Sequence, residues 1–181
     1  MIEVDVLTLL APGERMWPEA LAALADQGFV RVRHFFTQGR RQPGEDRIQT
    51  IARARNEAKA QGTAPYVLFL DRDVVLPPRG IERLAFGLAV HREYGALGIN
   101  YQSPASSPAP HVAMGAVLFR RSVLEQIRFR TEPGRCECLC CCLDLRRLGY
   151  QIDYLPNVRA EHPKLRPGER VRSDQEPAQR G

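Results

Sequence analysis

Residues 66–73 read Tyr66-Val67-Leu68-Phe69-Leu70-Asp71-Arg72-Asp73, an apolar run that stops abruptly at two aspartates. A continuous apolar run is typical of a parallel strand covered on both faces. In open α/β sheets, ligands bind at the carboxyl ends of the strands. On an extended backbone, two side chains with one residue between them point to the same side. Asp71 and Asp73 therefore suit a hard divalent cation such as Mg²⁺ or Mn²⁺. Such a cation can in turn hold a diphosphate. The alternative is that both aspartates are ordinary turn and cap residues.

The segments on either side of this run alternate between strand-like and helix-like patterns. We expect strands at 4–10, 29–36, 96–101, 112–119 and 151–155, and helices at 17–27, 48–62, 77–94, 122–127 and from the cysteine-rich segment to Gly149. Residues 103–110 are rich in proline and serine and are predicted to form a loop. Such alternation predicts an α/β fold with a mainly parallel sheet and helices on both of its faces.

The chain has 181 residues, which is enough for one domain, and 44% of them are hydrophobic and 26% charged. Residues 1–162 are expected to form the compact domain, and the polar segment 163–181 a weakly packed tail. No apolar run approaches the roughly 20 residues that a membrane span requires. The acidic start of the sequence, Met1-Ile2-Glu3-Val4-Asp5, argues against a secretion signal. A cytoplasmic location is therefore the expectation.

The formal net charge is +5, and 24 of the 26 basic residues are arginine, the exceptions being Lys59 and Lys164. Biased codon use explains such a composition, and so does anion handling, because guanidinium pairs with phosphate through two hydrogen bonds. Seven arginines fall between Arg31 and Arg55. They suit a nucleotide-diphosphate site, whereas no nucleic-acid-binding motif accompanies them, so nucleic acid is not an expected partner.

All five cysteines lie between Cys136 and Cys142. An odd number packed this tightly is a poor disulfide framework and points to a reducing compartment. Three roles remain open at this point. The thiols could pack as small apolar groups, bind a soft cation such as Zn²⁺ or Cu⁺, or take part in redox or substrate chemistry.

Four segments, taken in order, resemble the GT-A glycosyltransferases, especially family 2. Residues 66–78 are similar to the segment with the D-x-D motif, and residues 53–58 to the preceding helix with an arginine and an asparagine. Residues 114–124 are similar to a strand that ends in an arginine pair, and His162 stands at the place of a late histidine. Residues 145–156, LRRLGYQIDYLP, resemble the pattern L-R-x-x-G-Y-x-I-x-Y-x-P of the same family.

The resemblance implies a glycosyltransferase that moves a sugar from a nucleotide-diphosphate donor to the hydroxyl of an unknown acceptor, with inversion at the anomeric carbon. It implies Mn²⁺ or Mg²⁺ as the cofactor, to neutralise the departing diphosphate. The metal ligands would be Asp71, Asp73 and His162. The donor-binding residues would be Arg53, Asn56, Asp71 and Arg72.

The sequence departs from the family pattern in two places. The segment 33–39 lacks the aspartate that normally grips the nucleotide, which leaves the base preference open. The glutamate-aspartate pair that supplies the catalytic base falls on Glu137 and Cys138, so Glu137 is the expected base and Asp144, about two helical turns further on, the second candidate. The alternatives are an inactive GT-A-like module that binds a nucleotide or a protein, and a metal-binding protein built on the cysteine cluster.

Overall fold

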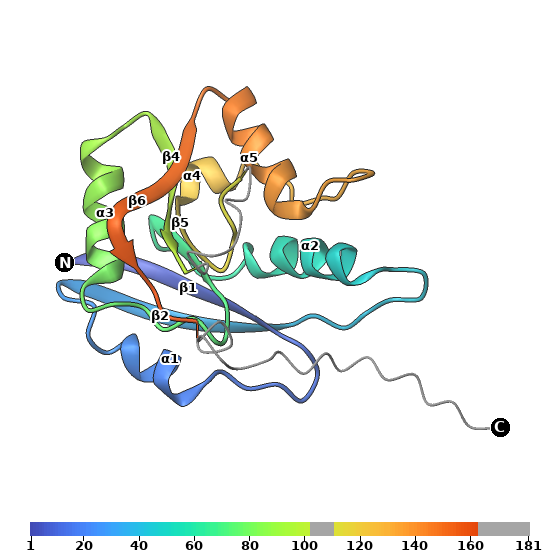
Figure 1. Ribbon diagram of the computed structural model, residues 1–181, viewed down its shortest axis with the longest axis horizontal. Coiled ribbons are helices and arrows are strands. Elements are labelled where there is room, and N and C mark those ends of the chain that lie inside the picture. The colour runs from blue at the N-terminus through green and yellow to red at the C-terminus, as the bar shows by residue number, and fades with distance from the viewer. Residues whose placement is uncertain (102–110, 163–181) are drawn as a thin grey trace.

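The computed structural model describes residues 1–101 and 111–162. Within these residues the chain forms six strands and five helices (Figure 1). The strands are β1 (Ile2–Leu10), β2 (Val30–Gln38), β3 (Tyr66–Leu70), β4 (Tyr94–Asn100), β5 (Ala116–Arg120) and β6 (Gln151–Arg159). The helices are α1 (Pro18–Ala23), α2 (Arg47–Ala58), α3 (Gly80–Val90), α4 (Arg121–Leu124) and α5 (Glu137–Arg147).

The six strands form one sheet in the order β2-β1-β3-β5-β4-β6. Strand β1 runs parallel to β2 and β3, and β4 runs parallel to β6, whereas β5 is antiparallel to both of its neighbours. The expected mainly parallel sheet is therefore confirmed. Because β5 is antiparallel to the other five strands, it begins at the edge of the sheet where those strands end.

The sheet separates two apolar clusters, and β3 contributes to both by simple alternation. Val67 and Phe69 pack with residues of α2, α4 and α5, while Leu68 and Leu70 pack with residues of α3. In Figure 1, α3 lies on the left of the central strands and α2 and α5 on the right. Helices thus cover both faces, as the sequence predicts.

Some boundaries differ from those expected. Helix α3 begins at Gly80 and not at Pro77, because a residue before proline is pushed out of the helical region and Arg79 adopts a left-handed conformation with φ of 57°. Strand β6 continues to Arg159, where it still pairs with Asn100 of β4. The predicted loop 103–110 and the predicted tail 163–181 lie outside the described residues. No described helix combines the length and apolarity needed to cross a membrane.

The buried carboxylate of Asp5 links β1 to its neighbours through hydrogen bonds. Asp5 on β1 is fully buried, and its carboxylate accepts hydrogen bonds from Arg33 Nε at 2.8 Å, Arg121 Nη2 at 2.6 Å and the Ala64 N–H at 2.7 Å. These contacts join β1, β2 and the start of α4 around one carboxylate.

Replacing Asp5 with alanine would leave the mostly buried Arg121 guanidinium without its carboxylate partner. We expect Asp5→Ala to lower the free energy of unfolding by about 3–5 kcal/mol in a urea titration. Glu3→Ala is the matched control on the same strand, because Glu3 forms an exposed ion pair with Arg31 and should matter far less. Similar losses in the two variants would show that the buried carboxylate has no special role.

Candidate functional site

A cavity of about 720 Å³ opens at the edge of the sheet where the parallel strands end. Its walls come from the loops after β1, β2, β3 and β4, from α2, from the segment before β5 and from the start of α5. The lining includes Leu10, Gly39, Arg41, Arg47, Arg55, Asp71, Arg72, Asp73, Tyr101, Met114, Gly115, Glu137 and Cys138. The topology therefore gathers side chains from distant parts of the sequence at one edge.

Asp71 and Asp73 both line this cavity, as the sequence predicts. The Asp71 N–H donates to the Gly115 carbonyl at 2.8 Å, which holds the end of β3 against the start of β5. The Asp71 side chain is 43% exposed and that of Asp73 only 11%. A β-carbon at position 115 would overlap the carboxylate of Asp71 and the hydroxyl of Tyr101, so only glycine leaves room for them there.

His162 is brought to Asp73 by a short backbone bridge. Val75 and Glu161 exchange two backbone hydrogen bonds, at 2.8 and 3.0 Å, and this places the end of the described chain beside the loop after β3. His162 Nε2 then lies 3.5 Å from Asp73 Oδ1. The ring of Tyr101 stacks on the imidazole with 5.8 Å between centroids. His162 thus lies beside one of the two aspartates that follow β3, and carboxylate and imidazole groups are both able to bind a divalent cation.

Arg55 is the site residue that the assignment from sequence missed. Its guanidinium is nearly buried, with Nη2 at 3.9 Å from Asp71 Oδ1 and Nε at 3.6 Å from Glu137 Oε1. The ring of Phe69 lies beneath it at 5.0 Å from centroid to Cζ. Arg55 Nε has no hydrogen-bond partner among the described residues. The sequence carried a signal for this position, because Arg55 falls on the apolar side of its helix, three residues from Ala52 and Ala58.

Glu137 is the first residue of α5 and lines the cavity with only 7% of its side chain exposed. The dipole of α5 favours a negative charge at this position. The Cys138 thiol donates to Glu137 Oε1 at 3.2 Å. Because one guanidinium touches both Glu137 and Asp71, these two carboxylates belong to the same site.

The Asp71 carboxylate lies close to two other carboxylates and to the Arg55 guanidinium. Although 43% of the Asp71 side chain is exposed, its carboxylate lies among protein atoms in the cavity, and this partial loss of water raises its pKa; Asp73 and Glu137 add to the rise, while Arg55 opposes it. The pKa of the Tyr101 hydroxyl is also raised, by burial and by Asp71. Carboxylates held close to one another repel, and a bound cation relieves that repulsion.

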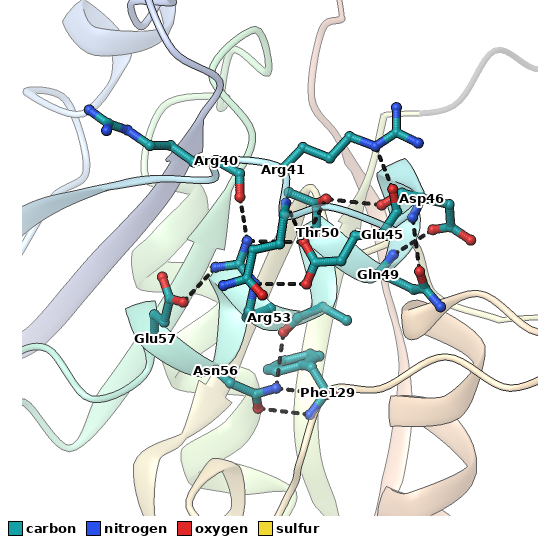
Figure 2. A network of polar contacts seen from close by, with 12 residues as sticks. Arg40, Arg41, Glu45, Asp46, Gln49, Thr50, Arg53, Asn56, Glu57 and Phe129 are labelled. Carbon is teal, nitrogen blue, oxygen red and sulfur yellow. Dashed lines mark hydrogen bonds and ion pairs between the residues drawn. The ribbon is translucent and has the colours of Figure 1, made fainter.

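Arg53 and Asn56 lie away from the cavity. Figure 2 shows the Arg53 guanidinium turned toward Glu45, Glu57 and the Arg40 carbonyl, with 2.9 Å to Glu45 Oε1 and 2.7 Å to Glu57 Oε1. This network lies beside the start of α2, where Asp46 and Gln49 form a reciprocal capping box.

Asn56 has a structural partner of its own. Its side chain donates to the Phe129 carbonyl at 2.7 Å and accepts from the Phe129 N–H at 3.0 Å, as Figure 2 shows. It therefore ties the segment after α4 to α2. Both residues expected to bind the donor from this helix, Arg53 and Asn56, are engaged in these contacts instead of lining the cavity.

Asp144, the second candidate for a base, also lies away from the cavity. Its carboxylate binds Arg130 through two hydrogen bonds, and Arg147 Nη1 lies 3.0 Å from Asp144 Oδ1.

Arg72 does line the cavity, where its guanidinium is 3.2 Å from Glu14 Oε1.

The cysteine-rich segment divides into two parts. Cys140, Cys141 and Cys142 are fully buried, and Cys141 and Cys142 belong to the apolar cluster beneath α5. Cys136 and Cys138 remain partly accessible, and Cys138 lines the cavity. Burial and the neighbouring Glu137 carboxylate raise the pKa of the Cys138 thiol.

No protein-family model and no curated protein matches the sequence, whereas several solved structures share its fold. A mannosyltransferase from Pyrobaculum calidifontis, in complex with GDP-Man and Mn²⁺, is 16% identical with a TM-score of 0.67 over 92% of this chain and 58% of its own. The catalytic domain of Drosophila β1,4-galactosyltransferase 7 is 18% identical with a TM-score of 0.60 over 97% and 76%. Glucosyl-3-phosphoglycerate synthase from Mycobacterium tuberculosis, in complex with Mn²⁺, UDP and phosphoglyceric acid, is 12% identical with a TM-score of 0.56 over 89% and 70%.

These similarities show a GT-A-like fold, the fold of nucleotide-diphospho-sugar transferases, as the resemblance of the sequence implied. The chain spans 58% of the length of the mannosyltransferase.

The raised pKa of Asp71 makes a prediction about stability. The pKa of this carboxyl is higher in the folded state than its ordinary value of 3.8. Ionisation of Asp71 therefore destabilises the folded state at neutral pH. This destabilisation disappears as the pH falls toward 3.8, where the carboxyl is protonated. In the presence of a chelator, Asp71→Asn should therefore be more stable than the parent at pH 7, with a smaller difference at pH 4, in urea titrations. Asp26→Asn, at an exposed aspartate, is the control and should change little. A less stable Asp71→Asn at pH 7 would mean that the attraction of Arg55 outweighs the loss of water.

Proposed function

We propose that this chain is a metal-dependent transferase that moves a sugar from a nucleotide-diphosphate donor to an acceptor hydroxyl. The observation that carries the proposal is that Asp71, Asp73, Arg55 and Glu137 line one cavity at the carboxyl edge of a GT-A-like sheet, with His162 in contact with Asp73. The complexes of two fold neighbours with Mn²⁺ and a nucleotide or nucleotide sugar support it.

Asp71, Asp73 and His162 are the residues that would hold the cation, Mn²⁺ or Mg²⁺. Carboxylate oxygens are the ligands that both ions prefer, and such an ion would relieve the repulsion between Asp71 and the neighbouring carboxylates. When bound, the cation supplies charge neutralisation for the diphosphate leaving group.

The cationic side chains of the cavity suit an anionic donor. Arg41, Arg47 and Arg72 line it together with Arg55. Arg41, Arg47 and Arg55 are three of the seven arginines between residues 31 and 55, the stretch whose composition predicted anion handling. Asp71 and Arg72 are the donor-binding residues that we retain, and Arg53 and Asn56 are left out.

Glu137 is the group that would take the proton. In an inverting transfer the acceptor oxygen attacks the anomeric carbon as the bond to the diphosphate breaks, and the acceptor proton passes to the base. Arg55 lies between Glu137 and Asp71, with its Nε 3.6 Å from Glu137 Oε1, and this contact would help to hold the Glu137 carboxylate in place. Glu137 thus offers a proton acceptor in the cavity that holds the D-x-D motif.

The metal ligands are tested by ligand-induced stabilisation. A nucleotide diphosphate at about 100 times its dissociation constant, with Mn²⁺, should raise the melting temperature by roughly 5–10 °C. Asp73→Asn should abolish the Mn²⁺-dependent part of this shift, because it removes a carboxylate ligand from the site.

Arg53→Gln is the matched control for this experiment. Its guanidinium is committed to Glu45 and Glu57 (Figure 2), so the variant can lose intrinsic stability but should keep the full shift on addition of ligand. A metal-dependent shift that survives in Asp73→Asn would remove the proposed cation site.

The base is tested by turnover. Glu137→Gln should lower kcat by roughly 10²–10⁴-fold and leave nucleotide binding nearly unchanged, because the base acts on the acceptor. Asp144→Asn is the control, since its carboxylate is bound to Arg130 and Arg147 away from the cavity. A parent protein that binds the nucleotide but releases no sugar to any acceptor would favour the nucleotide-binding module, to which the cysteine at position 138 already points.

A further inference from the structure

Three potential metal ligands meet at the side of the cavity, next to the carboxylate site. His111, Cys136 and Cys138 each place a ligand atom within 4.8 Å of the other two. His111 Nε2 lies 3.3 Å from Cys136 Sγ. All three residues are partly accessible, so an ion can reach them.

The chemistry of this set differs from that of the carboxylate site. Thiolates and imidazole select Zn²⁺ and other soft or borderline cations, whereas carboxylates select Mn²⁺ and Mg²⁺. Zinc bonds of about 2.0–2.3 Å in a tetrahedron separate the ligand atoms by about 3.5–3.8 Å. The pair at 3.3 Å is slightly closer than this spacing, and side-chain shifts of about 1 Å or less bring the whole cluster to it.

The backbone presents the three ligands from two elements. Cys136 is the N-cap of α5 and Cys138 lies in its first turn, so the Cys-x-Cys spacing places both thiols at one end of the helix. His111 comes from the segment that leads into β5. The remaining cysteines are accounted for by packing, because Cys140, Cys141 and Cys142 are fully buried.

We propose that His111, Cys136 and Cys138 bind one Zn²⁺ ion, with the fourth coordination position open toward the cavity. The opening follows from Cys138, which lines the cavity and lies 3.2 Å from Glu137 Oε1. The ion would clamp the start of α5 to the segment before β5, and would thereby fix the helix end that carries Glu137. Binding of Zn²⁺ does not depend on the proposed transferase activity, whereas the effect on Glu137 rests on it.

The test begins with metal content and spectroscopy of the full chain, purified and kept under a phosphine reductant that does not bind zinc. After dialysis we expect one tightly held Zn²⁺ per chain. Substitution with Co²⁺ should give thiolate-to-metal charge-transfer absorption in the near ultraviolet together with the visible bands of a tetrahedral site. A parent protein that retains no Zn²⁺ and shows no thiolate absorption with Co²⁺ would overturn the proposal.

The variants assign the ligands. Cys136→Ser and His111→Gln should each weaken Zn²⁺ binding by more than roughly a hundredfold, measured by competition with a chromogenic chelator. Cys141→Ala, at a buried cysteine outside the cluster, should keep the parent affinity. Unchanged affinity in both Cys136→Ser and His111→Gln would show that zinc binds elsewhere.

The two metal sites can be separated in the same proteins. Asp73→Asn should lose the Mn²⁺-dependent nucleotide shift and keep its Zn²⁺, whereas Cys136→Ser should lose Zn²⁺ and keep the nucleotide shift. Failure of the transferase proposal would therefore leave the zinc result intact. Loss of Zn²⁺ in Asp73→Asn would mean that the carboxylates hold the zinc, and would contradict the assignment to His111 and the two thiols.

Discussion

The buried guanidinium of Arg55 is the interaction on which the site depends. A charge withdrawn from water is tolerated only when it is paired, and Arg55 has carboxylates on two sides, Asp71 at 3.9 Å and Glu137 at 3.6 Å. Neither contact is at ideal hydrogen-bond distance, and Phe69 and Phe129 supply aromatic faces instead. The arrangement joins α2, β3 and α5 through one charge, so the geometry of the site and the packing of three elements are set together.

Strand β5 is antiparallel to both of its neighbours, so β3 and β4 run in the same direction. For this reason Asp71 and Asp73, which follow β3, lie at the same edge of the sheet as the end of β6. Insertion of β5 between β3 and β4 leaves β1, β2, β3, β4 and β6 all ending at the same side. Tyr101 follows β4, Gly115 precedes β5, and His162 follows β6, so each reaches the loop that carries Asp71 and Asp73. A sheet with β5 in the parallel sense would place Gly115 at the opposite edge and remove the backbone contact that holds Asp71.

Much of the fold and part of the site could be predicted from sequence. Alternating strand and helix patterns predict the α/β sheet, and the abrupt end of an apolar strand at two aspartates marks the edge of the sheet at which the cavity opens. The choice between Arg53 and Arg55 could not be made by motif position alone. Residues two apart on a helix point about 200° from each other, so one arginine joins the surface network of Figure 2 and the other enters the core. The apolar neighbours of Arg55 at three-residue spacing were the better guide. The bridge between Val75 and Glu161 is a tertiary contact, and no local pattern predicts it.

The cysteine at position 138 affects the charge balance as well as the chemistry. An aspartate there would add a second carboxylate at the start of α5, against one guanidinium already shared with Asp71. A neutral thiol avoids that repulsion and donates a hydrogen bond to Glu137 at 3.2 Å, which leaves Glu137 as the single charged acid at this helix end among the residues that line the cavity. When Zn²⁺ displaces its proton, the same sulfur, with Cys136 and His111 beside it, becomes part of a soft ligand set next to a hard one, and the ion balances the charge of the thiolate. The substitution that departs most from the glycosyltransferase pattern is therefore also the one that makes a second, chemically distinct metal site possible.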